Sequence, residues 1–209
     1  MTNETPAVHA DLAFLRTIVE GDGRPLRSFG LVYMYAGLAY GAQVLIQWAE
    51  FAGVAPLPGF VMLGVVTLPT AGLFALSITL AWRARGTGVS PPNRTLNAVF
   101  SGTGLANVVV IAMLVMIAAS LKMFAFILVY PAVIFTFQGA AWFVAFRVFR
   151  RAWMLAVAVG WFATSLAMAA AISTQSLHAY LGVAVGALFV FMALPGAIVM
   201  REGRKEAPA

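Results

Sequence analysis

The stretch that decides the fold is AWMLAVAVGWFATSLAMAAAI, residues 152–172, which runs for 21 positions without a charged side chain. An α-helix rises about 1.5 Å per residue, so about 20 apolar residues are enough to cross a hydrocarbon core about 30 Å thick. An apolar helix in the core of a water-soluble domain is usually shorter. The stretch therefore predicts a membrane span.

Five similar runs lie elsewhere in the chain, and the six together predict an all-α, polytopic transmembrane bundle. The expected spans lie near residues 29–49, 60–82, 96–119, 123–146, 152–172 and 177–200. Short turns or polar, proline-bearing segments such as residues 83–94 separate them, and short connections make consecutive helices neighbours. The composition agrees, since only 10% of the 209 residues are charged, against about a quarter in soluble domains.

Lysine and arginine are distributed unevenly between the two ends of the expected bundle. Only Lys122 falls at one end, and the other 12 of the 13 basic residues fall at the opposite end: Arg16, Arg24, Arg27, Arg83, Arg85, Arg94, Arg147, Arg150, Arg151, Arg201, Arg204 and Lys205. Because basic residues are retained on the cytoplasmic side, we expect both termini in the cytoplasm and the spans in a bacterial inner (plasma) membrane. This topology accounts for the net charge of +6, so no nucleic-acid partner is expected.

The segment before the first span, residues 1–28, carries an amphipathic pattern. Apolar side chains recur at helical spacing through Val8, Leu12, Leu15 and Val19, and Pro6 suits the first helical position. The pattern predicts a short cytoplasmic helix over residues 6–20. Such a helix either lies along the membrane surface, or packs under the bundle, or docks a cytoplasmic protein partner. The last residues, 201–209, are expected to form a basic cytoplasmic tail.

A polar stripe is the most informative feature of the first span. Tyr33, Tyr40, Gln43, Gln47 and Glu50 fall on one helical face. Amide side chains are costly against lipid tails, so this face should point into the bundle. The polar side chains then either join helices by hydrogen bonds or line a cavity. The candidate ligand- or pore-lining set combines four of the stripe residues with two amides on other spans: Tyr33, Tyr40, Gln43, Gln47, Asn107 and Gln138.

Three polar residues are expected at a similar depth near the outer face of the bundle. They are Glu50 after the first span, Lys122 after the third and His178 at the start of the sixth. If they cluster, Glu50 and Lys122 would favour each other's charged forms and His178 could respond to pH. The alternative is three ordinary interface residues, because such side chains commonly reach into water from helix ends.

Glycine and tryptophan positions give further expectations about packing. Gly37 with Gly41, and Gly182 with Gly186, form GxxxG motifs that permit close approach of another helix. Tryptophans near span ends are expected at the membrane interfaces, whereas Trp161 is deep enough to pack in the core or line a pocket. The interfacial set is Trp48, Trp82, Trp142 and Trp153.

The inventory of reactive side chains makes catalysis improbable. The chain has no cysteine, its histidines are far apart at positions 9 and 178, and no paired carboxylates lie within a span, so no metal or cofactor site is expected. The leading hypothesis is a non-catalytic accessory or sensory component that acts through a cytoplasmic or membrane partner, with homo-oligomerisation possible. The alternative is a small uncoupled transporter or channel for a neutral polar solute, and a third reading is a lipid- or quinone-modifying enzyme using Glu50 and His178.

Overall fold

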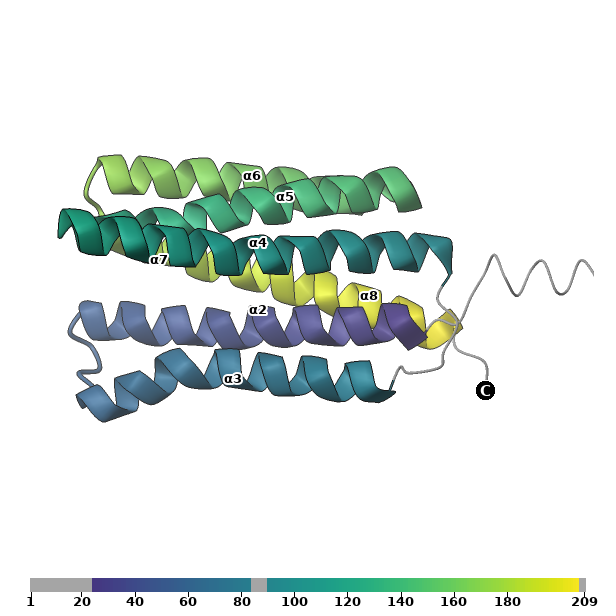
Figure 1. Ribbon diagram of the computed structural model, residues 1–209, viewed down its shortest axis with the longest axis horizontal. Helices are drawn as coiled ribbons and strands as arrows, with labels where there is room; N and C mark the ends of the chain where they lie inside the picture. Colours follow the sequence, from purple (N-terminus) through teal and green to yellow (C-terminus); the bar gives the residue numbers. More distant parts are fainter. Residues whose placement is uncertain (1–23, 84–89, 207–209) are drawn as a thin grey trace, which may run out of the picture.

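The computed structural model describes residues 24–83 and 90–206. Within this part the chain is all-α, with six helices long and apolar enough to cross a membrane, as the hydropathy pattern predicts. The amphipathic helix expected over residues 6–20 lies outside the described residues. The spans run side by side along the long axis of the molecule (Figure 1), the arrangement of a multi-pass membrane protein.

Four spans are single helices, and two contain a segment of different helical pitch. The single helices are α2 (Arg24–Phe51), α3 (Gly59–Arg83), α4 (Pro91–Leu121) and α6 (Ala152–Ser173). The fourth span begins with a 3₁₀ turn, η1 (Phe124–Leu128), and continues as α5 (Val129–Phe149). The sixth is α7 (Leu177–Ala187), the π-helical η2 (Leu188–Ala193) and α8 (Leu194–Glu206). We call the end where α2 and α4 begin and α8 ends the basic end.

The helices extend beyond the expected spans mainly at the basic end. Pro91 opens α4 five residues before the apolar run at Leu96, because proline fits the first helical position, and Ser90 precedes it with an extended backbone. The same helix ends at Leu121, and the left-handed backbone of Lys122 (φ 54°) turns the chain so that the N–H of Met123 reaches the carbonyl of Ala118 at 3.0 Å. The expected basic tail is helical as far as Glu206.

The core is an aromatic and aliphatic cluster between α2, α5, α6 and the sixth span. Trp142, Trp161 and Met168 are completely buried within it. The interfacial position expected for Trp142 is wrong, because its ring lies inside the bundle, 5.4 Å from the ring of Tyr33 and 5.7 Å from that of Phe100. A position near the end of a span does not determine whether the side chain faces lipid or protein.

The first and last spans cross closely enough for their backbones to come into contact. A Cβ added at Gly37 would lie 2.7 Å from the Cα of Ala193, and one added at Gly30 would lie 2.8 Å from the carbonyl oxygen of Gly196. Only glycine permits backbones to approach so closely. Pro195 sits at this crossing without an N–H to donate, and a π turn such as η2 is one way in which membrane helices re-pair the freed carbonyl.

The second GxxxG motif has the opposite environment. A Cβ added at Gly182 or Gly186 would meet no atom within 4 Å, so these glycines face outward from the bundle. Identical spacing therefore marks a helix crossing in α2 and an open face in α7.

Helix α3 is peripheral. None of its residues is buried, and α2 is the helix on which it mainly rests. In Figure 1 it forms the lower edge of the bundle, with α2 between it and the remaining spans. The hydroxyl of Tyr35 on α2 lies against Gly72 of α3. Because Gly72 has no side chain, α3 can pack closely against α2 at this point.

Candidate functional site

The polar stripe of α2 is divided among separate environments. In the half of α2 nearer the basic end, the buried Tyr33 hydroxyl donates to Gln138 Oε1 (3.1 Å) and accepts from Trp142 Nε1 (2.7 Å), both on α5. The hydroxyl thus satisfies an acceptor and a donor one helical turn apart on the facing helix. These contacts join α2 to α5 and leave Tyr33 and Gln138 little freedom to bind a solute.

One buried donor beside this group lacks a partner. The indole Nε1 of Trp161 makes no hydrogen bond within the described residues. The Trp161 ring itself is held by aromatic contacts, 4.7 Å from the Phe135 ring and 6.1 Å from the Phe191 ring. Its position supports a packing role in the core.

The next stripe residue joins α2 to α3. The hydroxyls of Tyr40 and Thr70 are 3.0 Å apart and share a hydrogen bond. Thr70 was not among the residues predicted from the sequence, because threonines are common in membrane helices and no pattern shows which one faces a neighbour. Hydroxyls of Thr67 and Thr79 bond to carbonyls of their own helix instead, at 2.8 and 2.7 Å.

Gln43 lies in a groove between α2 and α3. The groove has a volume of about 500 Å³ and is lined by small or apolar residues of both helices, including Ala39, Ala42, Gly64, Val65 and Pro69. The side-chain oxygen of Gln43 is buried and has no hydrogen-bond partner within the described residues. We refer to this feature as the α2–α3 groove.

Asn107 on α4 also has a buried, unpartnered oxygen, Oδ1. Gln47 is half-buried, and the structure gives it no hydrogen bond among the described residues. Of the six candidate lining residues, Tyr33, Tyr40 and Gln138 are therefore held by hydrogen bonds to other helices. No hydrogen bond to another helix holds the other three, Gln43, Gln47 and Asn107, within the described residues.

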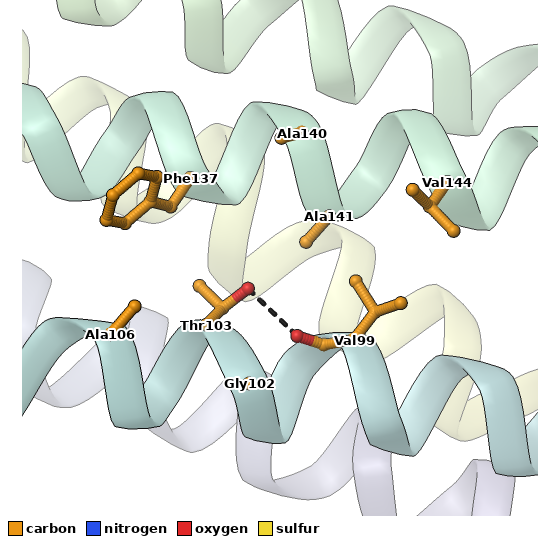
Figure 2. Close-up of a pocket in the computed structure, with 8 residues that line it drawn as sticks. All are labelled: Val99, Gly102, Thr103, Ala106, Phe137, Ala140, Ala141 and Val144. Atoms are coloured by element: carbon orange, nitrogen blue, oxygen red, sulfur yellow. Dashed lines mark hydrogen bonds between the residues drawn. The ribbon is translucent and has the colours of Figure 1, made fainter.

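A smaller pocket lies between α4 and α5 (Figure 2). Its volume is about 240 Å³, and its one polar side chain is Thr103. That hydroxyl donates to the Val99 carbonyl of its own helix at 2.9 Å, the bond drawn in Figure 2. The pocket wall is otherwise aliphatic or aromatic, as at Phe137 and Val144. It offers shape for hydrocarbon but no free polar side chain.

The expected outer-face group is brought together only in part. His178 approaches the end of α2, where its ring lies 4.7 Å from that of Phe51, the neighbour of Glu50. Lys122 is exposed at the end of α4. Within residues 24–83 and 90–206, no ion pair joins Glu50 to Lys122. No group of three or more histidine and acidic side chains in this part of the chain is placed to hold a metal.

An ion pair at the basic end was not predicted from the sequence. Arg151, before α6, pairs with Glu202 of α8. Glu202 Oε2 is buried and has no hydrogen bond besides this contact. The pair ties the connection between α5 and α6 to the end of the last span.

Comparisons of the chain with protein-family models, curated proteins and solved structures find no match.

Proposed function

We propose that this integral membrane protein is a non-catalytic accessory or sensory component that acts through a partner protein in the membrane. The proposed setting is a bacterial inner membrane with both termini in the cytoplasm. The observation that carries the proposal is the position of α3. This span of 25 residues has no buried residue and rests mainly on α2.

The exposed surface of α3 supports a lateral contact. Phe74, Ile78 and Trp82 follow one another at intervals of four residues and have 60%, 51% and 65% of their surfaces exposed. Residues four apart lie on one helical face. Helices in membranes associate through shape and packing, since lipid tails are as apolar as leucine. A large aromatic and aliphatic ridge on a peripheral span suits insertion against another helix.

The division of the polar stripe also supports this proposal over a transport path. Tyr33 and Gln138 are bonded in the core, and Tyr40 is bonded to α3. A path for a solute would need these groups to be free to exchange hydrogen bonds with it.

A small uncoupled transporter or channel for a neutral polar solute is the second candidate. It is favoured by the two buried amide oxygens without partners, Gln43 Oε1 and Asn107 Oδ1. If water or solute reaches both, the unpaired oxygens are explained without a protein partner.

Photo-crosslinking in native membranes tests the leading proposal. A benzophenone amino acid is placed at Phe74 or Ile78 on α3, and in matched controls at Val159 or Leu166, which are also exposed but lie on α6. The proposal predicts a protein adduct of one defined mass from the α3 positions and lipid adducts alone from the α6 positions. Lipid adducts alone from all four positions would contradict it.

A further inference from the structure

The positive charge of the described side chains is concentrated at the basic end of the bundle. Glu202 is the only side-chain carboxylate that the structure describes at this end, and it is already paired with Arg151. The basic side chains described at the same end are all arginines: Arg27, Arg83, Arg94, Arg147, Arg150, Arg151 and Arg201.

The use of arginine in place of lysine carries chemical information. Retention of positive charge on one side of a membrane is served by either residue. A guanidinium group, however, can donate two parallel hydrogen bonds to a phosphate, whereas a lysine ammonium acts as a point charge. The arginines therefore suit contact with phosphate groups at the membrane surface.

Two of these arginines lie next to the apolar pocket between α4 and α5. Arg147 is in the last turn of α5 and Arg150 caps that helix. Both are exposed, and neither pairs with a carboxylate among the described residues. Arg147 follows Val144, which lines the pocket (Figure 2), by three residues, or about 4.5 Å along the helix axis. Its long side chain can reach a group at that end of the pocket.

The pocket opens toward the bilayer and suits hydrocarbon. Gly102, Ala140 and Val144 of its lining are exposed, so a chain can enter sideways. The Thr103 hydroxyl is already bonded to the Val99 carbonyl, which leaves no polar side chain in the wall to be satisfied. The volume of about 240 Å³ is below the range of about 300–1,000 Å³ for sites that enclose a whole small molecule. It suits a stretch of one acyl chain.

We propose that this pocket and the two arginines beside it bind one molecule of an anionic phospholipid. A stretch of acyl chain lies in the pocket between α4 and α5. The phosphate lies at the basic end of the pocket and accepts hydrogen bonds from the Arg147 guanidinium. Arg150, three residues further toward the end of the bundle, adds a second positive charge at the level of the headgroup.

Charge complementarity favours an anionic headgroup over a zwitterionic one. Phosphatidylcholine and phosphatidylethanolamine carry an ammonium group beside the phosphate, and that group would face two guanidinium ions. Glu202, the described carboxylate at this end, is occupied by Arg151. Phosphatidylglycerol carries a phosphate and hydroxyl groups without a cation. The inference concerns the face between α4 and α5 and does not rest on the protein contact proposed for α3.

A pair of photoreactive lipids tests the site directly. Full-length protein in phosphatidylcholine vesicles is irradiated with phosphatidylglycerol that carries a diazirine in one acyl chain, or with phosphatidylcholine of the same chains, over a range of probe mole fractions. Adducts are located by mass spectrometry. We expect adducts within residues 99–106 and 137–144. Half-saturation by phosphatidylglycerol should need an about 20-fold lower mole fraction, since each arginine near the surface contributes about fivefold.

Charge variants assign this preference to the arginines. Arg147→Gln should raise the half-saturating mole fraction of phosphatidylglycerol about fivefold and leave that of phosphatidylcholine unchanged. The matched control is Arg83→Gln, which removes the same charge from an exposed arginine in the last turn of α3, away from the lining of the pocket. It should leave both values unchanged. Glycerol phosphate dissolved in the buffer should not displace either probe, because it lacks the acyl chain.

Glycine variants assign the acyl chain to the pocket. A Cβ added at Gly102 would meet no atom within 4 Å, so Gly102→Leu fills the pocket without a clash and should reduce labelling by both lipids. Gly104 is equally open but does not line the pocket, so Gly104→Leu should retain labelling. Each variant is first checked for an unchanged elution profile and circular dichroism spectrum.

Four results would overturn the proposal. Equal half-saturation by the two lipids would show that the headgroup is not selected. Equal effects of Arg147→Gln and Arg83→Gln would show a general attraction of charge without a site. Adducts outside the two segments, or labelling that survives Gly102→Leu, would place the acyl chain elsewhere. Displacement of the lipid by glycerol phosphate would identify a soluble anion as the ligand.

Discussion

Replacing Gly37 by alanine tests the close crossing of α2 and the sixth span, where Gly37 faces Ala193 of η2. The added methyl group would lie 2.7 Å from the Cα and 2.9 Å from the Cβ of Ala193, whereas ordinary contacts begin near 3.4 Å. Two of the opposing atoms belong to the backbone or are fixed directly to it, so no side-chain rotation relieves the clash. The helices must separate by about 1 Å, a gap that forfeits a quarter to a half of each affected contact.

The expected loss in the free energy of unfolding is about 1–3 kcal/mol, the usual cost of overfilling a packed interior. The higher helix propensity of alanine offsets at most about 1 kcal/mol of it. The matched control is Gly186→Ala in α7, where the methyl group meets no atom within 4 Å. Its expected effect lies between zero and a stabilisation of about 1 kcal/mol.

Reversible unfolding in mixed micelles provides the assay, with the mole fraction of sodium dodecyl sulfate as the variable. Tryptophan fluorescence reports on the transition because Trp142 and Trp161 are completely buried in the native bundle. Circular dichroism confirms that each variant retains its helical content. Equal unfolding free energies for Gly37→Ala and Gly186→Ala would refute the close crossing.

Two further substitutions test the hydrogen-bond and charge contacts. Tyr33→Phe leaves the buried Trp142 Nε1 and Gln138 Oε1 without their shared partner, so the free energy of unfolding should fall by about 1–2 kcal/mol. The control is Tyr35→Phe, measured in the same micelles. If Tyr33→Phe lowers the free energy of unfolding no more than this control does, the Tyr33 hydroxyl does not join the helices. Arg151→Gln removes the ion pair with Glu202. Because the side chains of Arg151 and Glu202 are 36% and 28% exposed, the free energy of unfolding should fall by at most about 1 kcal/mol. Thermal unfolding at low and high salt measures this effect, and a loss that persists unchanged at high salt would contradict an electrostatic origin.

The number and approximate limits of the spans could be predicted from the sequence because hydropathy over about 20 residues directly reflects the thickness of the bilayer. The exact ends of the helices were harder to predict from the sequence. Pro91 reads as part of a polar connection, yet it opens α4, since proline is compatible with the first turn of a helix and not with its interior.

Contacts between spans could not be predicted from the same information. Gly37 and Gly186 belong to identical motifs but face Ala193 and open space, respectively. The polar stripe of α2 was correctly seen as a helical face, but a face of this width meets several neighbours. Tyr33 therefore bonds to α5, whereas Tyr40 bonds to α3. The α2–α3 groove is lined by residues of both helices, Gln43 and Pro69 among them, and neither helix specifies such a groove alone.

We propose that the polar stripe of α2 does not line a water-filled path, and thiol labelling can check this because the native chain has no cysteine. Single cysteines replace Tyr40, Gln43 and Asn107, with Ser173→Cys and Arg94→Cys as exposed controls at opposite ends of the bundle. We expect a charged, water-soluble thiol reagent to label both controls and none of the three membrane positions. We expect an apolar, membrane-permeant maleimide to label the Gln43 position from the bilayer. Labelling of the Gln43 and Asn107 positions by the charged reagent would show that water reaches the stripe and would favour the transporter or channel instead.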